Sequence, residues 1–293
     1  MYRRIVLAVD PDGLAESVLP VLATLARRSG GEVFIVGAAK SSEAQDVKET
    51  LDRHVQEATA ELTAAGINAH GEVRLVPEVS SVAEVIVSAC HEHAADLVAL
   101  GSHGHGSLAA LIEGSIGRQV LAKVEAPALL VHRRMPADVG FVPSRLRRIV
   151  VPVDFSETSR QAVLVARDLA REQGATILIL HIREMVPWGD MPYIESPREA
   201  EELVKPLADL LHQAGVEVEV RITGPELNPA PVIAKTADEW NADLLVLGSR
   251  RLTPAGGLLL GSVAQAVVHQ TNRPVLMAGH PAHEPERSSA PRG

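Results

Sequence analysis

The sequence is poor in aromatic residues and in cysteine. Aromatic side chains make up 2% of the 293 residues, so the core must be built from Val, Leu, Ile and Ala, a composition that favours layered α/β packing. Cys90 is the only cysteine, which excludes an intramolecular disulfide and a zinc site built on cysteines, and which fits a reducing compartment. No segment approaches the ~20 apolar residues that a membrane-spanning helix needs.

Basic residues are also in the minority. The chain has 28 Lys and Arg against 37 Asp and Glu, for a formal net charge of −9, and this balance argues against a general nucleic-acid-binding protein. Arg3 and Arg4 precede an apolar run, as in a signal peptide, but the run is short and stops at Asp10. We therefore expect a cytoplasmic protein that has neither a nucleic acid nor a membrane as partner.

The second half of the chain repeats the first. Asp10 returns as Asp154, and a Gly-Ser pair at 114–115 returns at 261–262. The longer matched segments are 3–10 with 147–154, 96–102 with 243–249, and 126–131 with 273–278. The offsets of 144 and 147 residues indicate two duplicated domains rather than a solenoid.

Composition suggests where these domains begin and end. We expect a first domain at 1–135, a linker with prolines and glycine at 136–145, a second domain at 146–280, and a polar, disordered tail at 281–293.

Apolar runs alternate with helical patterns within each copy. The expected strands lie near 4–10, 31–38, 72–76, 96–101 and 127–132, and again near 148–154, 175–182, 216–222, 243–248 and 274–278. Because the runs are nearly continuous, they suit parallel strands covered on both faces. We therefore expect two α/β domains, each an open, doubly wound, five-stranded parallel sheet flanked by helices.

Local signals support some of these elements. Ser81 with Glu84, and Ser196 with Glu199, have the spacing of capping boxes that start helices. Cys90 falls on the apolar stripe of the first of these helices, so we interpret it as a small core residue. The stretch 185–197 reads as a long loop after the second strand of the second copy.

A glycine-rich stretch, residues 101–115, connects an apolar run to a helix start. Glycines let the backbone approach a ligand closely, and the first N–H groups of a helix lack internal partners, so this context suits a phosphate. A tight turn with Ser115 as helix cap would explain the same residues, but the second copy of the arrangement favours a ligand. Asp10, at the end of the first strand, could accept hydrogen bonds from a ribose, help to hold a metal, or cap the next segment.

The glycine pattern resembles that of a known family. Gly101-x2-Gly104-x9-Gly114-Ser115 resembles the pattern Gly-x2-Gly-x9-Gly-Ser/Thr, with which the universal stress protein family binds nucleotides. The strand-end aspartate, the duplication and the Pro-Ala/Val-Leu final strand fit as well. The resemblance covers both repeats and implies a tandem form with two Rossmann-like domains of the adenine nucleotide alpha hydrolase-like type.

The resemblance implies that the first copy binds ATP, with Mg²⁺ beside the phosphates. The residues that it places in the site are Asp10, Ala38, Gly101, Gly104, Gly114 and Ser115. The strand ends would meet adenine and ribose, and the glycines and the serine would meet ribose and the phosphates. The chain has no Walker A lysine, so phosphate binding would depend on backbone N–H groups and hydroxyls.

The second copy carries the corresponding set with one departure. The matching residues are Asp154, Ile182, Gly248, Arg251, Gly261 and Ser262. Arg251 replaces the second glycine, and its side chain could block close approach of a nucleotide or contact a phosphate. We expect binding in this copy too, although Arg251 and the small Ala38 give each copy one departure from the family.

The resemblance implies an ATP-binding regulatory or signalling module of the stress response. The residues include no general base beside an activated nucleophile, so we expect at most slow hydrolysis. A nucleotide-dependent enzyme, such as an ATPase or a nucleotidyl transferase, and an interaction protein whose second copy has lost nucleotide binding are the alternatives. The resemblance also implies that the final strands, 128–131 and 275–278, pair across the two domains, and it leaves a homodimer as a further possibility.

Four histidines offer a metal site as a further alternative. They are His91, His93, His103 and His105. His91 and His93 are two residues apart near a helix end and so do not share a face. We interpret the four as solvated or phosphate-facing polar residues.

Overall fold

The structure is a computed structural model that describes residues 1–11, 15–101, 115–131, 145–183, 185–186, 193–251, 258–259 and 261–279. The predicted linker at 136–145 lies outside the described residues except for Arg145, and the predicted tail at 281–293 lies wholly outside them.

Each half of the chain alternates strands with helices. The first half comprises β1 (Arg4–Val9), α1 (Ala15–Ser29), β2 (Glu32–Lys40), α2 (Gln45–Ala64), β3 (Asn68–Val76), α3 (Val82–Glu92), β4 (Leu97–Gly101), α5 (Ser115–Lys123) and β5 (Ala128–Val131). The second half comprises β6 (Arg148–Val153), α6 (Glu157–Gln173), β7 (Thr176–Ile182), α7 (Pro197–Gln213), β10 (Glu217–Thr223), α8 (Pro229–Glu239), β11 (Leu244–Gly248), α9 (Ser262–Gln270) and β14 (Val275–Ala278).

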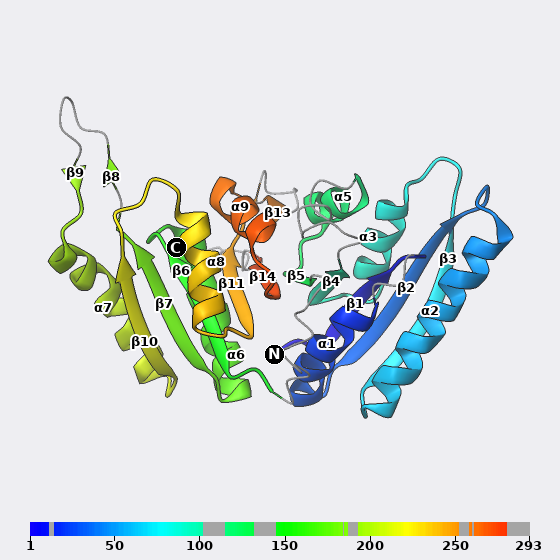
Figure 1. Ribbon diagram of the computed structural model, residues 1–293. Helices are drawn as coiled ribbons and strands as arrows, with labels where there is room; N and C mark the ends of the chain where they lie inside the picture. Colours follow the sequence, from blue (N-terminus) through cyan, green and yellow to red (C-terminus); the bar gives the residue numbers. More distant parts are fainter. Residues whose placement is uncertain are drawn as a thin grey trace, which may run out of the picture.

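The two halves share one ten-stranded sheet, in the order β10-β7-β6-β11-β14-β5-β4-β1-β2-β3. Within each half the strands are parallel, as expected, and the halves join where β5 and β14 pair antiparallel (Figure 1). The register at this junction sets Leu130 opposite Val275 and Leu129 opposite Leu276. The predicted pairing of the final strands is therefore confirmed, and the two five-stranded sheets are one continuous layer.

Helices cover both faces of the sheet because successive side chains of a buried strand point to opposite faces. Ile5 and Leu7 belong to the core under α1, α2, α6 and α7, whereas Val6 belongs to the core under α3, α5, α8 and α9. Each core contains residues from both halves, so burial continues across the junction.

The local signals in the sequence start helices where they were expected. In α3, Ser81 accepts a hydrogen bond from the Glu84 N–H at 3.2 Å, and the Glu84 carboxylate accepts one from the Ser81 N–H at 3.0 Å. Ser196 and Glu199 form the same capping box at α7. Cys90 is 4% exposed in α3, as its place on the apolar stripe predicts.

The stretch at 185–197 differs from the predicted loop. β8 (Met185–Val186) pairs antiparallel with β9 (Tyr193–Ile194) before α7 begins at Pro197. Two-residue strands leave no periodic pattern in a sequence, so only the pairing of the chain with itself reveals them. Among the described residues, no helix is long and apolar enough to cross a membrane.

Candidate functional site

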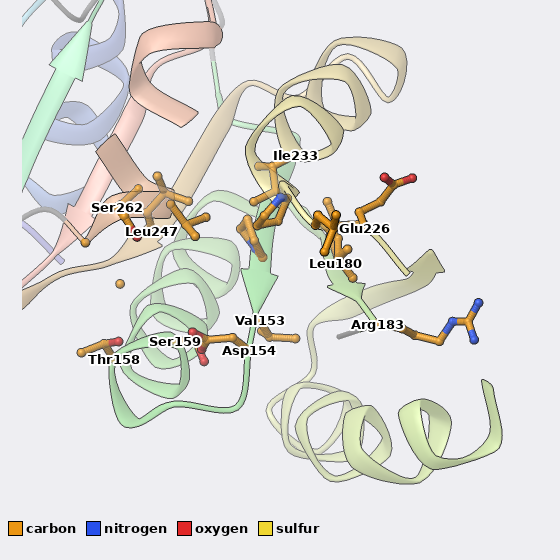
Figure 2. A pocket seen from close by; sticks show the side chains of 18 residues that line it. Val153, Asp154, Thr158, Ser159, Leu180, Arg183, Glu226, Ile233, Leu247 and Ser262 are labelled. Carbon is orange, nitrogen blue, oxygen red and sulfur yellow. The ribbon is translucent and has the colours of Figure 1, made fainter. Parts of the chain in front are cut away.

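The sheet order places a crevice beside the strand ends of each half. The order within a half reverses direction between β1 and β4, and between β6 and β11, and ligands of doubly wound sheets bind where the order reverses. A cavity of about 360 Å³ lies at this position in the second half, within the size range of small-molecule sites. We call it the C-terminal cavity. It is lined by the ends of β6, β7 and β11, the loop residues Glu226 and Leu227, and the N-terminal turns of α6, α8 and α9 (Figure 2).

The start of α9 forms a polar end of this cavity. Gly261 is the N-cap residue and supplies no side-chain cap, and the first backbone bond of the helix runs from the Gln265 N–H to the Gly261 carbonyl at 2.9 Å. The next three residues, 262–264, line the cavity and begin the helix, so their N–H groups have no partner within it. By contrast, α6, α7 and α8 each begin with a side-chain cap. Unpaired N–H groups at the positive end of a helix dipole suit an anionic group such as a phosphate.

The two glycines of the second-copy motif, Gly248 and Gly261, occupy their positions for different physical reasons. A Cβ built on Gly261 would meet no atom within 4 Å, and its φ of −62° is open to any residue, so neither packing nor conformation requires glycine there. A Cβ on Gly248 would lie 2.6 Å from the backbone carbonyl atoms of Thr158, in the first turn of α6. Gly248 therefore lets α6 approach the end of β11, whereas Gly261 leaves space at the cavity.

Asp154 follows β6 and lines the cavity near Thr158 and Ser159 (Figure 2). Its carboxylate accepts hydrogen bonds from the Ser156 N–H at 3.0 Å and from the Ser156 hydroxyl at 2.5 Å. Burial by itself would raise the pKa of Asp154, but the hydrogen bonds from Ser156 and Ser159 outweigh it and hold the pKa below its usual value. Asp154 is therefore an anion that is held in place and can accept further bonds from hydroxyls or a cation.

Apolar side chains form the opposite part of the cavity. Leu180, Ile182, Ile233 and Leu247 line it, and Leu227 lies at its rim with 84% of its surface exposed. An exposed leucine beside an apolar wall offers a surface to a flat ring. The cavity thus combines an uncapped helix start, a carboxylate and an apolar wall.

The first half presents the matching strand ends. Val9 pairs with Gly37 as Val153 pairs with His181, so Ala38 occupies the place of Ile182. Asp10 follows β1, Gly101 ends β4 in a buried position, and Ser115 begins α5. Gly104 and Gly114 lie outside the described residues, as does the side chain of Ser115.

Comparison with known proteins identifies the family. The profile of the Universal stress protein family matches residues 1–132 and 145–279. The chain belongs to this family. A solved universal stress protein from Archaeoglobus fulgidus covers 94% of the chain, and 96% of that protein is covered in turn, with a TM-score of 0.68 at 21% identity. This likeness shows the tandem fold.

Two curated universal stress proteins match about one half of the chain. One, from Thermus aquaticus, is 34% identical over 134 residues, which are 45% of this chain and 97% of that protein. Another, from Methanocaldococcus jannaschii, is 29% identical over 146 residues, or 47% of this chain and 85% of its own.

Arg251, which departs from the family pattern, has its backbone in a short ladder. β12 (Arg250–Arg251) pairs antiparallel with β13 (Leu258–Leu259), and β13 lies against α5 of the other half. The side chain of Arg251 lies outside the described residues. The second copy thus brings this two-stranded ladder against the first half.

The histidines form no metal site where the structure describes them. His93 stacks on Phe34, with ring centroids 3.9 Å apart, and its Nε2 lies 3.6 Å from the Glu72 carboxylate. No cluster of three His, Cys, Asp or Glu side chains suited to a metal occurs in the described part of the chain. His103 and His105 lie outside it.

Sequence reasoning missed several residues that line the C-terminal cavity. They are Thr158, Ser159, Arg183, Glu226 and Ile233, among others. One signal was present, because Pro225-Glu226-Leu227 repeats Pro77-Glu78-Val79, and Val79 is also exposed, at 96%. The other residues come from three separate elements and share no pattern along the chain.

Proposed function

We propose that this universal stress protein binds an adenine nucleotide in the C-terminal cavity and, by the repeat, in the corresponding crevice of the first half. The observation that carries the proposal is the uncapped start of α9, where Gly261 leaves open space at a cavity with an apolar wall. The phosphates would bind to the N–H groups at 262–264 and the Ser262 hydroxyl, and the base would lie against Ile182 and Ile233.

Asp154 would accept hydrogen bonds from the ribose or coordinate Mg²⁺ that arrives with ATP. Carboxylate and hydroxyl oxygens are ligands that Mg²⁺ prefers, and Asp154, Thr158 and Ser262 supply them around the cavity. Because this set has few charges, most of the ligands of the ion would be phosphate oxygens and water.

We propose a regulatory or signalling role rather than efficient catalysis. The carboxylates that line the cavity in the described part of the chain are Asp154 and Glu226, and Asp154 is engaged by Ser156. The hydroxyls beside Asp154 are occupied by the start of α6: Ser156 donates to Asp154 and accepts from the Ser159 N–H, and the Ser159 hydroxyl donates to the Ser156 carbonyl oxygen. We infer that this set is a helix cap and not a general base with an activated nucleophile. Hydrolysis of ATP would therefore be slow, and the single cysteine fits a cytoplasmic setting.

Calorimetric titration of Mg·ATP, and of ADP and AMP, into protein freed of nucleotide tests the proposal. Gly261→Ala and Ser262→Ala should each weaken one site about tenfold, since a methyl group takes up the space of the ligand and a hydroxyl donor is lost. Ser88→Ala is the matched control, because the Ser88 hydroxyl bonds Glu92 on the exposed side of α3, in the other half. Absence of binding to the wild-type protein would refute the proposal and favour an interaction protein.

A further inference from the structure

A buried pair of side chains, His181 and Glu195, lies behind the strand end that bears Asp154. His181 in β7 is 2% exposed, and Glu195, between β9 and α7, is 7% exposed. The His181 Nδ1 lies 3.0 Å from the Val153 carbonyl oxygen, and its Nε2 lies 2.8 Å from the Glu195 Oε2. Neither side chain lines the cavity, and the nucleotide site as described above leaves both without a role.

The chemistry of these contacts fixes the imidazole. A carbonyl oxygen only accepts, so the His181 Nδ1 carries a hydrogen that it donates to Val153. The 2.8 Å contact between Nε2 and the Glu195 carboxyl group requires one further proton between them. Glu195 therefore selects the orientation of the ring, and the ring in turn holds the backbone of Val153.

The segment held by His181 is the turn that presents Asp154. Val153 directly precedes Asp154, and Phe155 directly follows it with a φ of 59°, in the left-handed region that non-glycine residues rarely adopt. The Phe155 ring lies 4.7 Å from the His181 ring, centroid to centroid. His181 thus contacts the turn on both sides of Asp154, by a hydrogen bond before it and a ring contact after it.

Another contact joins Glu195 to a residue that lines the cavity. The Arg183 guanidinium donates to the Glu195 carbonyl oxygen at 3.1 Å and also to the Gly224 carbonyl oxygen. Arg183 lines the cavity, and Gly224 begins the loop that carries Leu227. Glu195 therefore contacts two residues: its carboxylate contacts His181, which holds the turn that bears Asp154, and its carbonyl oxygen contacts Arg183, which also binds the loop that carries Leu227.

The first half of the same chain lacks this pair. Gly37 occupies the place of His181, and a Cβ there would meet the side chain of Leu51 at 2.9 Å. An apolar contact from α2 thus fills the space that the buried polar pair fills in the second half. The two strand-end aspartates are supported by different chemistry, which gives an internal comparison.

We propose that His181 and Glu195 are positioning residues that hold the Asp154 carboxylate where it accepts a hydrogen bond from the 2′-hydroxyl of a bound ribonucleotide. This rests on the proposed function and specifies it: the C-terminal cavity prefers ribonucleotides to 2′-deoxyribonucleotides, and the preference depends on the buried pair.

The test compares Mg·ATP with Mg·2′-dATP by calorimetric titration into the full chain. The wild-type C-terminal cavity should bind ATP about tenfold more tightly than 2′-dATP, the value of a hydrogen bond to a charged acceptor. Glu195→Ala should bring this ratio close to one by weakening ATP and leaving 2′-dATP unchanged. Glu195→Gln should restore most of the ratio, because its amide N–H can donate to a neutral Nε2.

A double variant shows whether the effect belongs to the C-terminal cavity. In the Gly261→Ala protein, where binding at this cavity is weakened, Glu195→Ala should have no further effect on the ratio of the ATP and 2′-dATP affinities. Equal weakening of both nucleotides by Glu195→Ala would show a merely structural role and overturn the inference. A wild-type cavity that binds neither nucleotide would instead refute the proposed function, which separates the two failures.

A second measurement is read from the wild-type protein, and a variant serves only to assign its signals. In ¹⁵N-labelled wild-type protein, the His181 ring signals, assigned with His181→Gln, should show a protonated Nδ1 and should move more with ATP than with 2′-dATP. An unprotonated Nδ1, or equal movement with both nucleotides, would overturn the inference.

Discussion

Replacement of Gly248 by alanine separates a glycine needed by the fold from one needed by a ligand. The new Cβ would lie 2.6 Å from the carbonyl carbon and oxygen of Thr158 and 3.0 Å from the Ser159 nitrogen, whereas ordinary contact begins at 3.4 Å. Because these atoms are backbone, no side chain can rotate to relieve the clash. The first turn of α6 must retreat from β11 by roughly 0.8 Å to restore contact.

The size of the effect follows from this geometry. Overpacking of this kind costs about 1–3 kcal/mol in unfolding free energy, which for a domain of this size lowers the melting temperature by roughly 2–10 °C. Nucleotide affinity should fall as well, because Thr158 and Ser159 line the cavity and move with the helix.

Gly261→Ala is the matched control, since it adds the same methyl group at the other motif glycine. Its Cβ meets no atom within 4 Å, so packing does not change. Alanine is a poorer N-cap than glycine, but it also restricts the unfolded chain, and the two effects are of similar size. We therefore expect its melting temperature to stay within about 2 °C of wild type while nucleotide affinity falls.

Thermal unfolding followed by circular dichroism, together with calorimetric titration of Mg·ATP, gives both quantities for both variants. The reasoning would be refuted if Gly248→Ala melted at the wild-type temperature, or if Gly261→Ala were the less stable of the two.

Other predictions concern burial, charge and the junction of the halves. The pKa of the Cys90 thiol is raised by burial from 9.0 to about 12, so thiol-specific labelling of native protein should be about a thousandfold slower than of unfolded protein, and a faster rate would place Cys90 outside the core. Asp154→Ala should cost about 1 kcal/mol at pH 7 through the lost bonds from Ser156. The pKa of Asp154 is lowered in the fold, so this contribution is fully present above the usual pKa of 3.8 and disappears as the pH falls through the lower folded value. In urea unfolding, the stability difference between the variant and wild type should therefore shrink as the pH is taken below 3.8. Leu276→Ala should cost about 2–5 kcal/mol and reduce hydrogen-exchange protection in β5 as well as β14, because Leu276 is fully buried and pairs with Leu129 across the junction; loss confined to the second half would contradict a shared core.

The strands, the helix starts and the duplication could be predicted from the amino-acid sequence alone. Apolar runs of strand length between helical patterns predict parallel α/β layers, because a strand buried on both faces must be apolar throughout. The Ser81 and Ser196 caps could be predicted because a capping box uses residues three apart, within one helical turn. The duplication places Asp154 and Gly261 at strand and helix ends without any reference to three-dimensional structure.

Contacts between distant residues were decided by the tertiary structure. Gly248 and Gly261 belong to one sequence pattern, yet only the approach of α6 shows that the first is needed for packing and the second leaves space at a cavity. The wall formed by Ile233 comes from a helix elsewhere in the chain, and no periodicity links it to the glycines.

The junction and the buried pair have the same origin. A sequence shows that residues 128–131 and 275–278 are apolar, but strand direction and register depend on how two surfaces meet. Neither His181 nor Glu195 belongs to a sequence motif. They come into contact because the fold places β7 beside the turn before α7. Patterns among residues close in the sequence determine the helices, the strands and the glycine motif. Strand pairing and packing between distant residues form the C-terminal cavity and the surroundings of Asp154.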